Sequence, residues 1–329
     1  MFVLSNRPLF DNRADAERFV VTGAAQRFIE AVERGRNALL EGDPGSGKTT
    51  VLHMLQLRLR EAGRPVAFVS LGQVDSLNHA AVAIYRAAYE QKWIDELDDE
   101  LTSQALGLED PFAPNQLIRA LAATPSDAVF LVDDIRGEVG HGLFGRLRDE
   151  LWQLGRAWAI ATDTDQATTM LRPPADAFFE FRTRLGPLPV EAQRELLDRR
   201  DAPHDWSLLF DANATPRRLI EAARMAAEAG ADPQALIRGS EARRDLAERI
   251  AGRPAGMLVA ELENLGPVSA GDERLLARLG WSRPRAATLL KRLENAGVLE
   301  SRREAADGPG QPRKVYELRD PLEFAERIG

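Results

Sequence analysis

The sequence contains no cysteine and only four histidines among its 329 residues. The lack of cysteine excludes disulfides, thiolate metal sites and cysteine nucleophiles. The histidines are scattered without the spacing of metal ligands, so we expect no zinc site. No apolar run approaches the ~20 residues that a transmembrane helix needs, and the N-terminus lacks the pattern of a secretory signal. We therefore expect a cytoplasmic protein that does not associate with membranes.

Lysine is also scarce, since only four of the 43 basic residues are lysines. This preference for arginine suggests a GC-rich bacterial genome. The net charge of −8 disfavours a protein that coats nucleic acid with its whole surface. The charge is uneven, however, because residues 281–318 carry eight Lys and Arg against five Asp and Glu. One basic segment thus lies within an acidic chain.

Short apolar runs alternate with helical periodicity through the first two thirds of the chain. This order predicts an α/β fold, in which helices cover a mostly parallel sheet. The expected strands are Asn37–Glu41, Pro65–Leu71, Ala128–Asp133, Ala157–Thr162 and Phe178–Leu185. The expected helices between them are Thr49–Ala62, Leu77–Glu90, Pro114–Ala122 and Leu143–Leu154.

The pattern changes after the fifth strand. Apolar residues then recur at spacings of three and four, which predicts a small helical subdomain over 187–232. Glycine and proline at 230–233 predict a break, followed by a connecting helix or linker over 233–252. The remaining segment, 253–329, combines three short helices with a hairpin. The predicted elements are Pro254–Leu265, Ala270–Leu279, Ser282–Ala296 and the hairpin Arg302–Leu318, with its turn at 307–312.

The most informative motif is Gly42-Asp-Pro-Gly-Ser-Gly-Lys-Thr49, which matches the P-loop pattern at each position. It follows an apolar strand and precedes a helix, as phosphate binding requires. Glycines allow the backbone to aim N–H groups at phosphates, and the helix N-terminus adds partial positive charge. Lys48 can reach the β- and γ-phosphates, and Thr49 can bind Mg²⁺. The predicted ATP/ADP-binding residues of this loop are Gly42, Asp43, Pro44, Gly45, Ser46, Gly47, Lys48, Thr49 and Thr50.

A pair of carboxylates follows the third predicted strand, at Asp133 and Asp134. The carboxyl end of a parallel strand lies at the edge of the sheet where ligands of open α/β folds bind. Asp133 is therefore expected to hold Mg²⁺ through water, together with Thr49.

Together these motifs resemble an AAA+ ATPase, and more narrowly the initiator-type clade of origin-recognition ATPases and their bacterial relatives. The resemblance implies an AAA+ nucleotide-binding domain over 1–186, with 187–232 as its helical lid. Residues Trp158-Ala-Ile-Ala-Thr-Asp163 resemble sensor 1. The resemblance implies that Thr162 or Asp163 is its catalytic polar residue, with Thr164 as the alternative register.

Two further segments carry the same resemblance. Phe10-Asp-Asn-Arg13 resembles the motif that lines the adenine pocket, which implies a nucleotide contact by Arg13. Ala214-Thr-Pro-Arg-Arg-Leu219 resembles the start of the sensor 2 helix. The resemblance implies that Arg217 contacts the nucleotide and acts in catalysis, with Arg218 as the alternative.

The chain departs from the family at Asp134, where many members carry Glu to orient the attacking water. The aspartate side chain is one methylene shorter, and a displacement of about 1 Å can cost about 10²-fold in rate. We therefore expect an ATPase that hydrolyses ATP slowly, as a switch does. The resemblance also implies an arginine supplied by a neighbouring copy, and hence self-association promoted by ATP. Arg172 is the preferred candidate and Arg182 the alternative, although a surface role for Arg172 is equally compatible.

The segment 253–329 resembles a winged helix-turn-helix domain. Such domains place one helix in the DNA major groove, while the wing follows the phosphate backbone. The expected DNA-binding residues are Arg283, Arg285, Thr288, Lys291, Arg292, Arg302, Arg303, Arg313 and Lys314. The alternative is a winged helix that binds a protein partner and leaves these cations in solvent.

Three functions are therefore compatible with the sequence. The first is an ATP-dependent switch associated with DNA and the nucleoid, as in replication initiation. The second is a signalling or defence ATPase with a protein effector. The third is an ATPase that selects targets for transposition.

Overall fold

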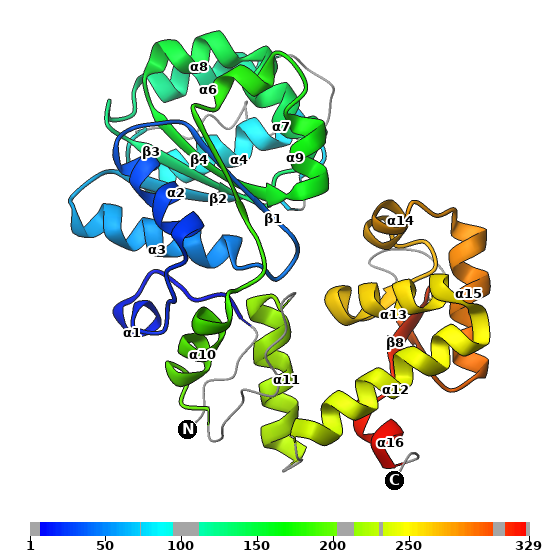
Figure 1. Cartoon of the computed structure of the whole chain (residues 1–329). Coiled ribbons are helices and arrows are strands. Elements are labelled where there is room, and N and C mark those ends of the chain that lie inside the picture. Colours follow the sequence, from blue (N-terminus) through cyan, green and yellow to red (C-terminus); the bar gives the residue numbers. More distant parts are fainter. Residues whose placement is uncertain are drawn as a thin grey trace. The chain divides into compact units, whose positions relative to one another are not determined.

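The computed structural model describes residues 7–72, 74–94, 112–202, 214–229, 233–304 and 313–326 (Figure 1). The chain divides into two compact units, a first unit of Arg7–Arg200 and a second unit that begins at Asp201. The division falls inside the segment 187–232 that was predicted as a lid. Among the described residues, no helix combines the length and apolar character needed to cross a membrane.

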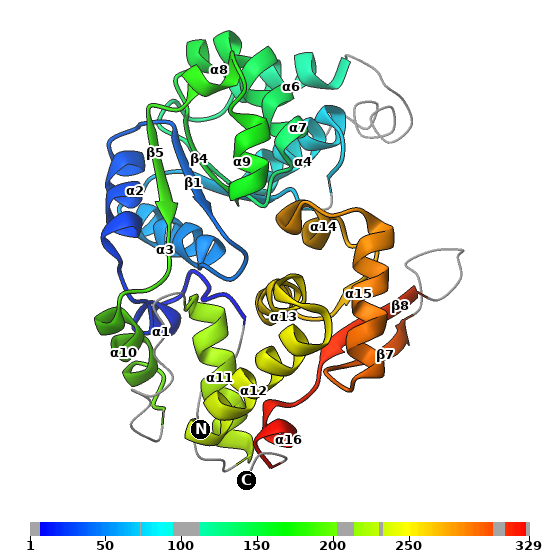
Figure 2. The ribbon, with the colours of Figure 1, turned by 45° about the vertical axis from the view of Figure 1, so that its right-hand side comes forward.

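A five-stranded parallel sheet forms the centre of the first unit, as predicted (Figure 2). Its strands follow the order β2-β3-β4-β1-β5, so β4 lies between β1 and β3. This order brings the ends of three strands next to the glycine-rich loop that follows β1. The strands are β1 (Ala38–Gly42), β2 (Val66–Ser70), β3 (Val129–Asp133), β4 (Ala157–Asp163) and β5 (Phe181–Leu185).

Helices cover both faces of this sheet. Successive residues of a strand point to opposite faces, so Leu39 packs in one hydrophobic core while Ala38 and Leu40 pack in the other. Helices α2 (Gly23–Glu33) and α3 (Lys48–Glu61) cover the face of Leu40. The opposite face is covered by α4 (Leu77–Glu90), α6 (Phe112–Ala122), α7 (Gly137–His141), α8 (Arg148–Leu154) and α9 (Thr164–Met170). Two short helices, α1 (Arg13–Ala16) and α10 (Val190–Asp198), complete the unit.

Two elements of the first unit differ from their predicted bounds by more than two residues. The helix expected over Leu143–Leu154 is interrupted, because a π-helical turn, η1 (Gly142–Arg146), precedes α8. The strand expected from Phe178 begins only at Phe181. Residues Ala175–Phe178 form a 3₁₀ turn, η2, which stacks the Phe178 ring on Phe144 at 5.0 Å. Aromatic packing thus takes these residues out of the sheet.

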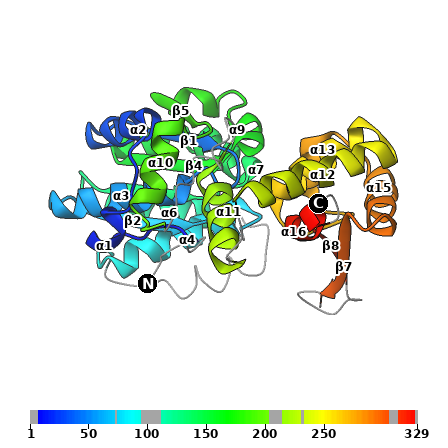
Figure 3. The same ribbon diagram turned by 60° about the horizontal axis from the view of Figure 1, so that its bottom comes forward.

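The second unit contains helices and a small antiparallel sheet of order β6-β8-β7 (Figure 3). Its core joins α12, α13, α14 and α15 to the strands, with Leu258, Leu290 and Leu293 fully buried. The hairpin prediction is met by β7 and β8, whereas its turn and the break at 230–232 lie outside the described residues. The elements are α11 (Pro216–Ala229), α12 (Pro233–Ala251), α13 (Arg253–Leu265), β6 (Val268–Ser269), α14 (Glu273–Leu279), α15 (Arg283–Asn295), β7 (Leu299–Glu304), β8 (Arg313–Leu318) and α16 (Pro321–Glu326).

Candidate functional site

The glycine-rich loop connects β1 to α3 through backbone conformations that favour glycine. Gly45 and Gly47 have φ values of 82° and 98°. Gly47 is the N-cap of α3 and has no side chain to cap the helix, so the N-cap leaves the N–H groups of the first turn available. At Gly42, an added Cβ would lie 2.6 Å from Ser46 Oγ and 3.0 Å from the Leu185 carbonyl oxygen. The loop is therefore tightly folded, with the dipole of a 14-residue helix behind it.

Lys48 is held inside this loop by three acceptors. Its Nζ donates to the carbonyl oxygens of Gly42 at 2.8 Å and Asp43 at 3.1 Å, and to Asp163 Oδ1 at 2.8 Å. An ammonium group has three donors, so this set uses all of them. Only 10% of the lysine side chain is exposed. The cation thus sits at a fixed position between the loop and the end of β4.

Thr49 and Asp133 form the second contact between the loop and the sheet. Thr49 Oγ1 donates to Asp133 Oδ2 at 2.8 Å. Asp133 is buried, and this burial raises the pKa of its carboxyl group, while the Thr49 hydroxyl opposes the shift. A hydroxyl and a buried carboxylate side by side are oxygen ligands of the kind that Mg²⁺ prefers.

Asp134 adopts an unusual backbone conformation, with φ of 57°. Aspartate tolerates this left-handed region better than most residues. Its N–H donates to the Ala161 carbonyl oxygen at 3.0 Å. The carboxylate lies against Gly72, where an added Cβ would approach Asp134 Oδ2 to 2.3 Å. Desolvation, followed by the nearby charges of Asp133 and Asp163, raises the pKa of Asp134.

The end of β4 presents two polar residues to different surroundings. Thr162 is buried, and its hydroxyl donates to the Ile135 carbonyl oxygen at 2.7 Å. Asp163 pairs with Gly42 in the sheet register and points toward Lys48. The pleat separates the neighbours onto opposite faces, so Asp163 joins the loop while Thr162 does not. Thr164, the alternative register, lies 3.4 Å from Asp43 through its hydroxyl.

The predicted adenine-pocket segment lies in the same unit. The side chain of Arg13 is 88% exposed and lies 3.6 Å from Glu61. Phe10 contacts His53, whose ring stacks on Phe68 at 4.5 Å. The Arg13 side chain thus lies on an open surface, whereas Phe10 packs edge-on against His53 of α3. Thr50, another predicted loop residue, accepts a hydrogen bond from the Leu9 N–H at 3.2 Å.

The candidate arginines differ in their surroundings. Arg172 donates to Glu138 at 2.6 Å and to the Thr169 carbonyl oxygen at 2.9 Å. Arg182 donates to the Asp176 carbonyl oxygen. In the second unit, Arg218 is paired with Glu263 at 3.2 Å. Arg217 is exposed, and it has no ion pair within the part of the chain that the structure describes.

The predicted DNA-binding residues fall into two groups. Four of them are exposed on α15 and form no ion pair among the described residues. They are Arg283, Arg285, Lys291 and Arg292. Thr288, also exposed, donates to the Pro284 carbonyl oxygen. Arg285 packs over the Trp281 ring at 4.7 Å. Helix α15 therefore carries uncompensated positive charge.

The hairpin cations are mostly compensated by carboxylates. Arg302 pairs with Glu304 at 2.9 Å and with Glu317 at 3.1 Å, and Lys314 pairs with Glu294 at 2.7 Å. Arg313 lies 4.0 Å from Glu304. Arg303 is the exposed hairpin cation without an ion pair among the residues that the structure describes. The basic surface is thus centred on the helix, with little contribution from the hairpin.

Two residues of the site were not identified from the sequence. Gly72 follows β2 and supports Asp134, and His53 lies one turn after Thr49 on α3. A glycine directly after a buried strand is a weak signal of close approach. No spacing rule connects Gly72 to Asp134, since they come from different strands.

Comparisons with known proteins give distant similarities. Residues 19–144 match the family described as Novel STAND NTPase 3, and this range includes the loop and both aspartates. The sequence matches none of the curated proteins compared with it.

Several solved structures are similar over most of the chain. The Orc1 protein of Aeropyrum pernix, solved in complex with DNA, is 17% identical, with 94% of this chain and 93% of that chain covered and a TM-score of 0.45. Cdc6p of Pyrobaculum aerophilum is 16% identical, with 95% and 96% covered and a TM-score of 0.49. AMPPCP-bound DnaA of Aquifex aeolicus is 16% identical, with 84% and 90% covered and a TM-score of 0.47.

Proposed function

We propose that the first unit binds ATP and ADP with Mg²⁺ and hydrolyses ATP slowly. The observation that carries this proposal is the hydrogen bond of 2.8 Å between Thr49 Oγ1 and Asp133 Oδ2, beside Lys48 and an uncapped helix N-terminus. The buried Ser46 hydroxyl has no hydrogen-bond partner among the described residues, which fits a loop built around a ligand. The family match over residues 19–144 adds support.

Each group of the site has a role in this proposal. The loop N–H groups and Lys48 hold the phosphates, and Thr49 and Asp133 hold the metal ion. Bound Mg²⁺ would neutralise phosphate charge during the reaction. Asp134 orients the attacking water from a carboxylate that rests on Gly72. Arg217, and Arg172 from a second copy, add positive charge at the phosphates.

Removal of the lysine tests this proposal. The variant Lys48→Ala is expected to lose ATP and ADP binding, measured by isothermal titration calorimetry, while its circular dichroism spectrum is unchanged. Lys92→Ala is the matched control, because Lys92 is an exposed lysine that follows α4. Unchanged ATP affinity in a folded Lys48→Ala protein would contradict nucleotide binding at this loop.

We further propose that the second unit contains a winged helix-turn-helix domain over 253–329 that engages DNA when the nucleotide state allows it. The order α13, β6, α14, α15 and the β7–β8 hairpin supports this interpretation. The four exposed cations of α15 support DNA as the partner of that helix. Such a protein would act as a switch, bacterial, cytoplasmic and associated with the nucleoid.

The salt dependence of DNA binding by the full chain tests which cations take part. Four phosphate contacts from α15 would give a slope of log K against log salt near −3.6, at about −0.9 per contact. Arg292→Ala is expected to reduce that slope by about one unit. Arg302→Ala is the matched hairpin control, and should change it less because Arg302 is already paired with two carboxylates. Equal effects of both variants would contradict a surface centred on α15.

A second candidate is a signalling or defence ATPase whose winged helix binds a protein. The compensated hairpin cations favour it, since a hairpin with internal ion pairs attracts phosphate weakly. The family match to Novel STAND NTPase 3 favours it as well. DNA binding and ATP turnover, measured with ATP, with ADP and without nucleotide, separate the candidates. DNA-stimulated hydrolysis would support a replication or transposition role, and the absence of DNA binding at low salt would support a protein partner.

A further inference from the structure

Asp163 occupies an unusual position for a carboxylate in a site proposed to bind phosphates. Strand β4 lies between β1 and β3, and Asp163 pairs in register with Gly42, the first residue of the loop. This placement brings its carboxylate to 2.8 Å from Lys48 Nζ. The side chain is 26% exposed, so solvent screens the pair only in part.

The three acceptors around Lys48 differ in how readily they are replaced. Two are carbonyl oxygens of Gly42 and Asp43, which the folded loop fixes in place. The third is the Asp163 side chain, which can rotate away. All three ammonium donors are in use, so a phosphate oxygen that binds Lys48 has to displace one acceptor. Asp163 is the acceptor that a phosphate would displace.

The charge around Asp163 makes that exchange sensitive to the number of phosphates. Asp134 lies between the charges of Asp163 and Asp133 in its electrostatic surroundings, since both of these carboxylates act on it. The loop N–H groups and Lys48 can both serve the β-phosphate that ADP and ATP share, whereas only ATP brings a terminal phosphate that makes a second demand on Lys48. The terminal phosphate of ATP therefore brings additional negative charge toward the carboxylates of Asp133, Asp134 and Asp163. A diphosphate makes one fewer demand on Lys48 and brings less negative charge, so it disturbs the Lys48–Asp163 pair less than ATP does.

We propose that Asp163 determines nucleotide specificity, favouring ADP over ATP by competing with the terminal phosphate for Lys48. This inference rests on the proposed binding of nucleotides at the loop. Asp163 acts as an internal substitute for the terminal phosphate, which stabilises the diphosphate-bound state of the switch. ATP then binds at the cost of separating the ion pair.

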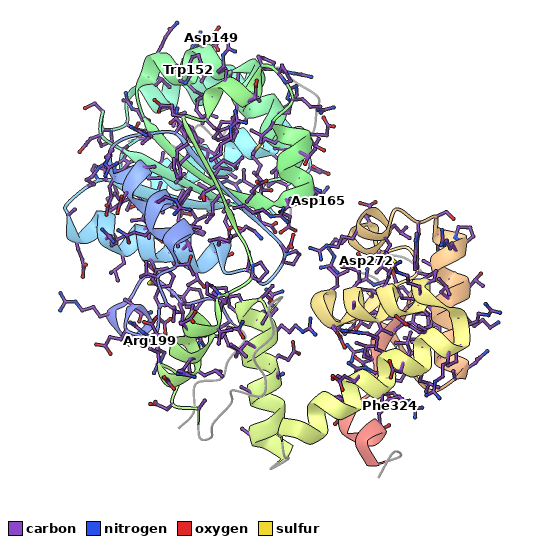
Figure 4. The ribbon with its side chains drawn as sticks, viewed as in Figure 1. Asp149, Trp152, Asp165, Arg199, Asp272 and Phe324 are labelled. Atoms are coloured by element: carbon purple, nitrogen blue, oxygen red, sulfur yellow. The ribbon has the colours of Figure 1, made fainter. Side chains whose placement is uncertain are left out.

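The test compares the affinities of ADP and of a non-hydrolysed ATP analogue, both with Mg²⁺, by isothermal titration calorimetry on the full chain. Asp163→Asn keeps the shape of the side chain and an oxygen acceptor for Lys48. We expect it to raise the affinity for the ATP analogue relative to ADP by at least about tenfold, the effect of removing a like charge about 4 Å away. Asp165→Asn is the matched control, because Asp165 is an exposed carboxylate at the start of α9 (Figure 4). In Asp165→Asn, the ratio of the affinity for the ATP analogue to the affinity for ADP should stay within about twofold of the wild-type value.

The ratio distinguishes this inference from a structural effect, because misfolding would weaken both nucleotides together. Asp163→Ala is a second variant, expected to shift the ratio in the same direction. An unchanged ratio in Asp163→Asn, or an equal shift in Asp165→Asn, would overturn the inference while nucleotide binding stands. A wild-type protein that binds neither nucleotide would contradict the proposed function itself.

Discussion

Buried carboxylates of the first unit differ in how their charge is compensated. Asp15 accepts two hydrogen bonds from Arg7, at 2.6 and 2.9 Å, and one from the Phe10 N–H at 2.8 Å. Asp133 accepts one from the Thr49 hydroxyl, and burial raises its pKa. The first arrangement stabilises the fold around a charge, whereas the second leaves a carboxylate with capacity for a cation.

Asp15 is expected to make stability depend on pH. The Arg7 hydrogen bonds lower the pKa of Asp15 from 3.8 to about 2. A lowered pKa means that the stabilisation is present above the ordinary value and is lost as the pH falls through about 2. We expect Asp15→Asn to reduce the free energy of unfolding by about 2 kcal/mol at neutral pH. On acidification, the variant should then lose less of its remaining stability than the wild-type protein does.

Urea denaturation at several pH values between neutrality and pH 3 measures this effect. Asp149→Asn is the control, since Asp149 is an exposed carboxylate of α8 (Figure 4). Equal pH dependence in wild type and Asp15→Asn would show that Asp15 does not carry it.

Gly72 is expected to set the position of Asp134. An added Cβ would lie 2.3 Å from Asp134 Oδ2, so Gly72→Ala has to displace that carboxylate. Displacement of a positioning group by about 1 Å can slow a reaction by about 10²-fold. We therefore expect Gly72→Ala to bind ATP normally and to turn it over at least about tenfold more slowly.

Single-turnover hydrolysis and calorimetry separate these two effects. Gly186→Ala is the control, because a Cβ there meets no atom within 4 Å. Normal turnover in Gly72→Ala would mean that Asp134 does not orient the water.

At the scale of elements, strong periodicity predicted the central sheet well. Helix α4 has the predicted bounds Leu77–Glu90, and the observed strand β4 extends its prediction by one residue. The break before α8 was not predicted, and it coincides with a close tertiary contact. A Cβ added at Gly145 would lie 3.3 Å from the Cβ of Ala175. The hydrophobic periodicity of the sequence cannot predict a contact between residues so far apart in the chain. Buried strands and long amphipathic helices are therefore predictable, whereas irregular turns are not.

The same distinction holds for the candidate site. Lys48 and Thr49 are adjacent in one motif, and Asp133 ends a buried run, so the sequence alone identifies all three. The choice between Thr162 and Asp163 depended on the pleat of β4, which fixes the face of each side chain. Gly72 belongs to the site only through the pairing of β2 with β3, which no local pattern encodes.

One buried carboxylate connects three helices of the second unit. Glu263 on α13 accepts from Arg243 and Arg244 of α12, each at 2.9 Å, and from Arg218 of α11 at 3.2 Å. The side chains of Arg243 and Glu263 are 6% and 7% exposed, and burial lowers the pKa of Arg243. Removal of one partner of a buried ion pair is strongly destabilising because the other charge stays buried.

We expect Glu263→Ala to lower the free energy of unfolding of the second unit by about 3 kcal/mol. The matched control is Glu261→Ala on the same helix, whose more exposed pair with Arg278 should contribute within about 1 kcal/mol. Urea denaturation measures both, and Glu263→Gln serves if the alanine variant does not fold. Similar losses for Glu263→Ala and Glu261→Ala would contradict the role of the buried cluster.

At the scale of the whole molecule, we expect ATP to promote self-association. The Arg172 side chain is 51% exposed and is held by Glu138, so a role in a second copy requires that pair to open. Light scattering with a non-hydrolysed ATP analogue measures assembly. Arg172→Ala should keep nucleotide affinity and lose the rise of turnover with protein concentration, whereas Arg182→Ala should retain it. A monomer at tens of micromolar would leave Arg172 as a surface residue.

The Glu263 cluster also joins α11 to the C-terminal core of the second unit. Arg218 follows Arg217 directly on α11, and its guanidinium shares Glu263 with the helices that build the C-terminal core. Arg243 in addition donates to the Arg319 carbonyl oxygen, just after β8. A rotation of α11 alone would therefore have to break the bond between Arg218 and Glu263, which joins α11 to α12 and α13. A displacement beginning at Arg217 would thus reach α13 through the neighbouring Arg218, and the end of β8 through Arg243.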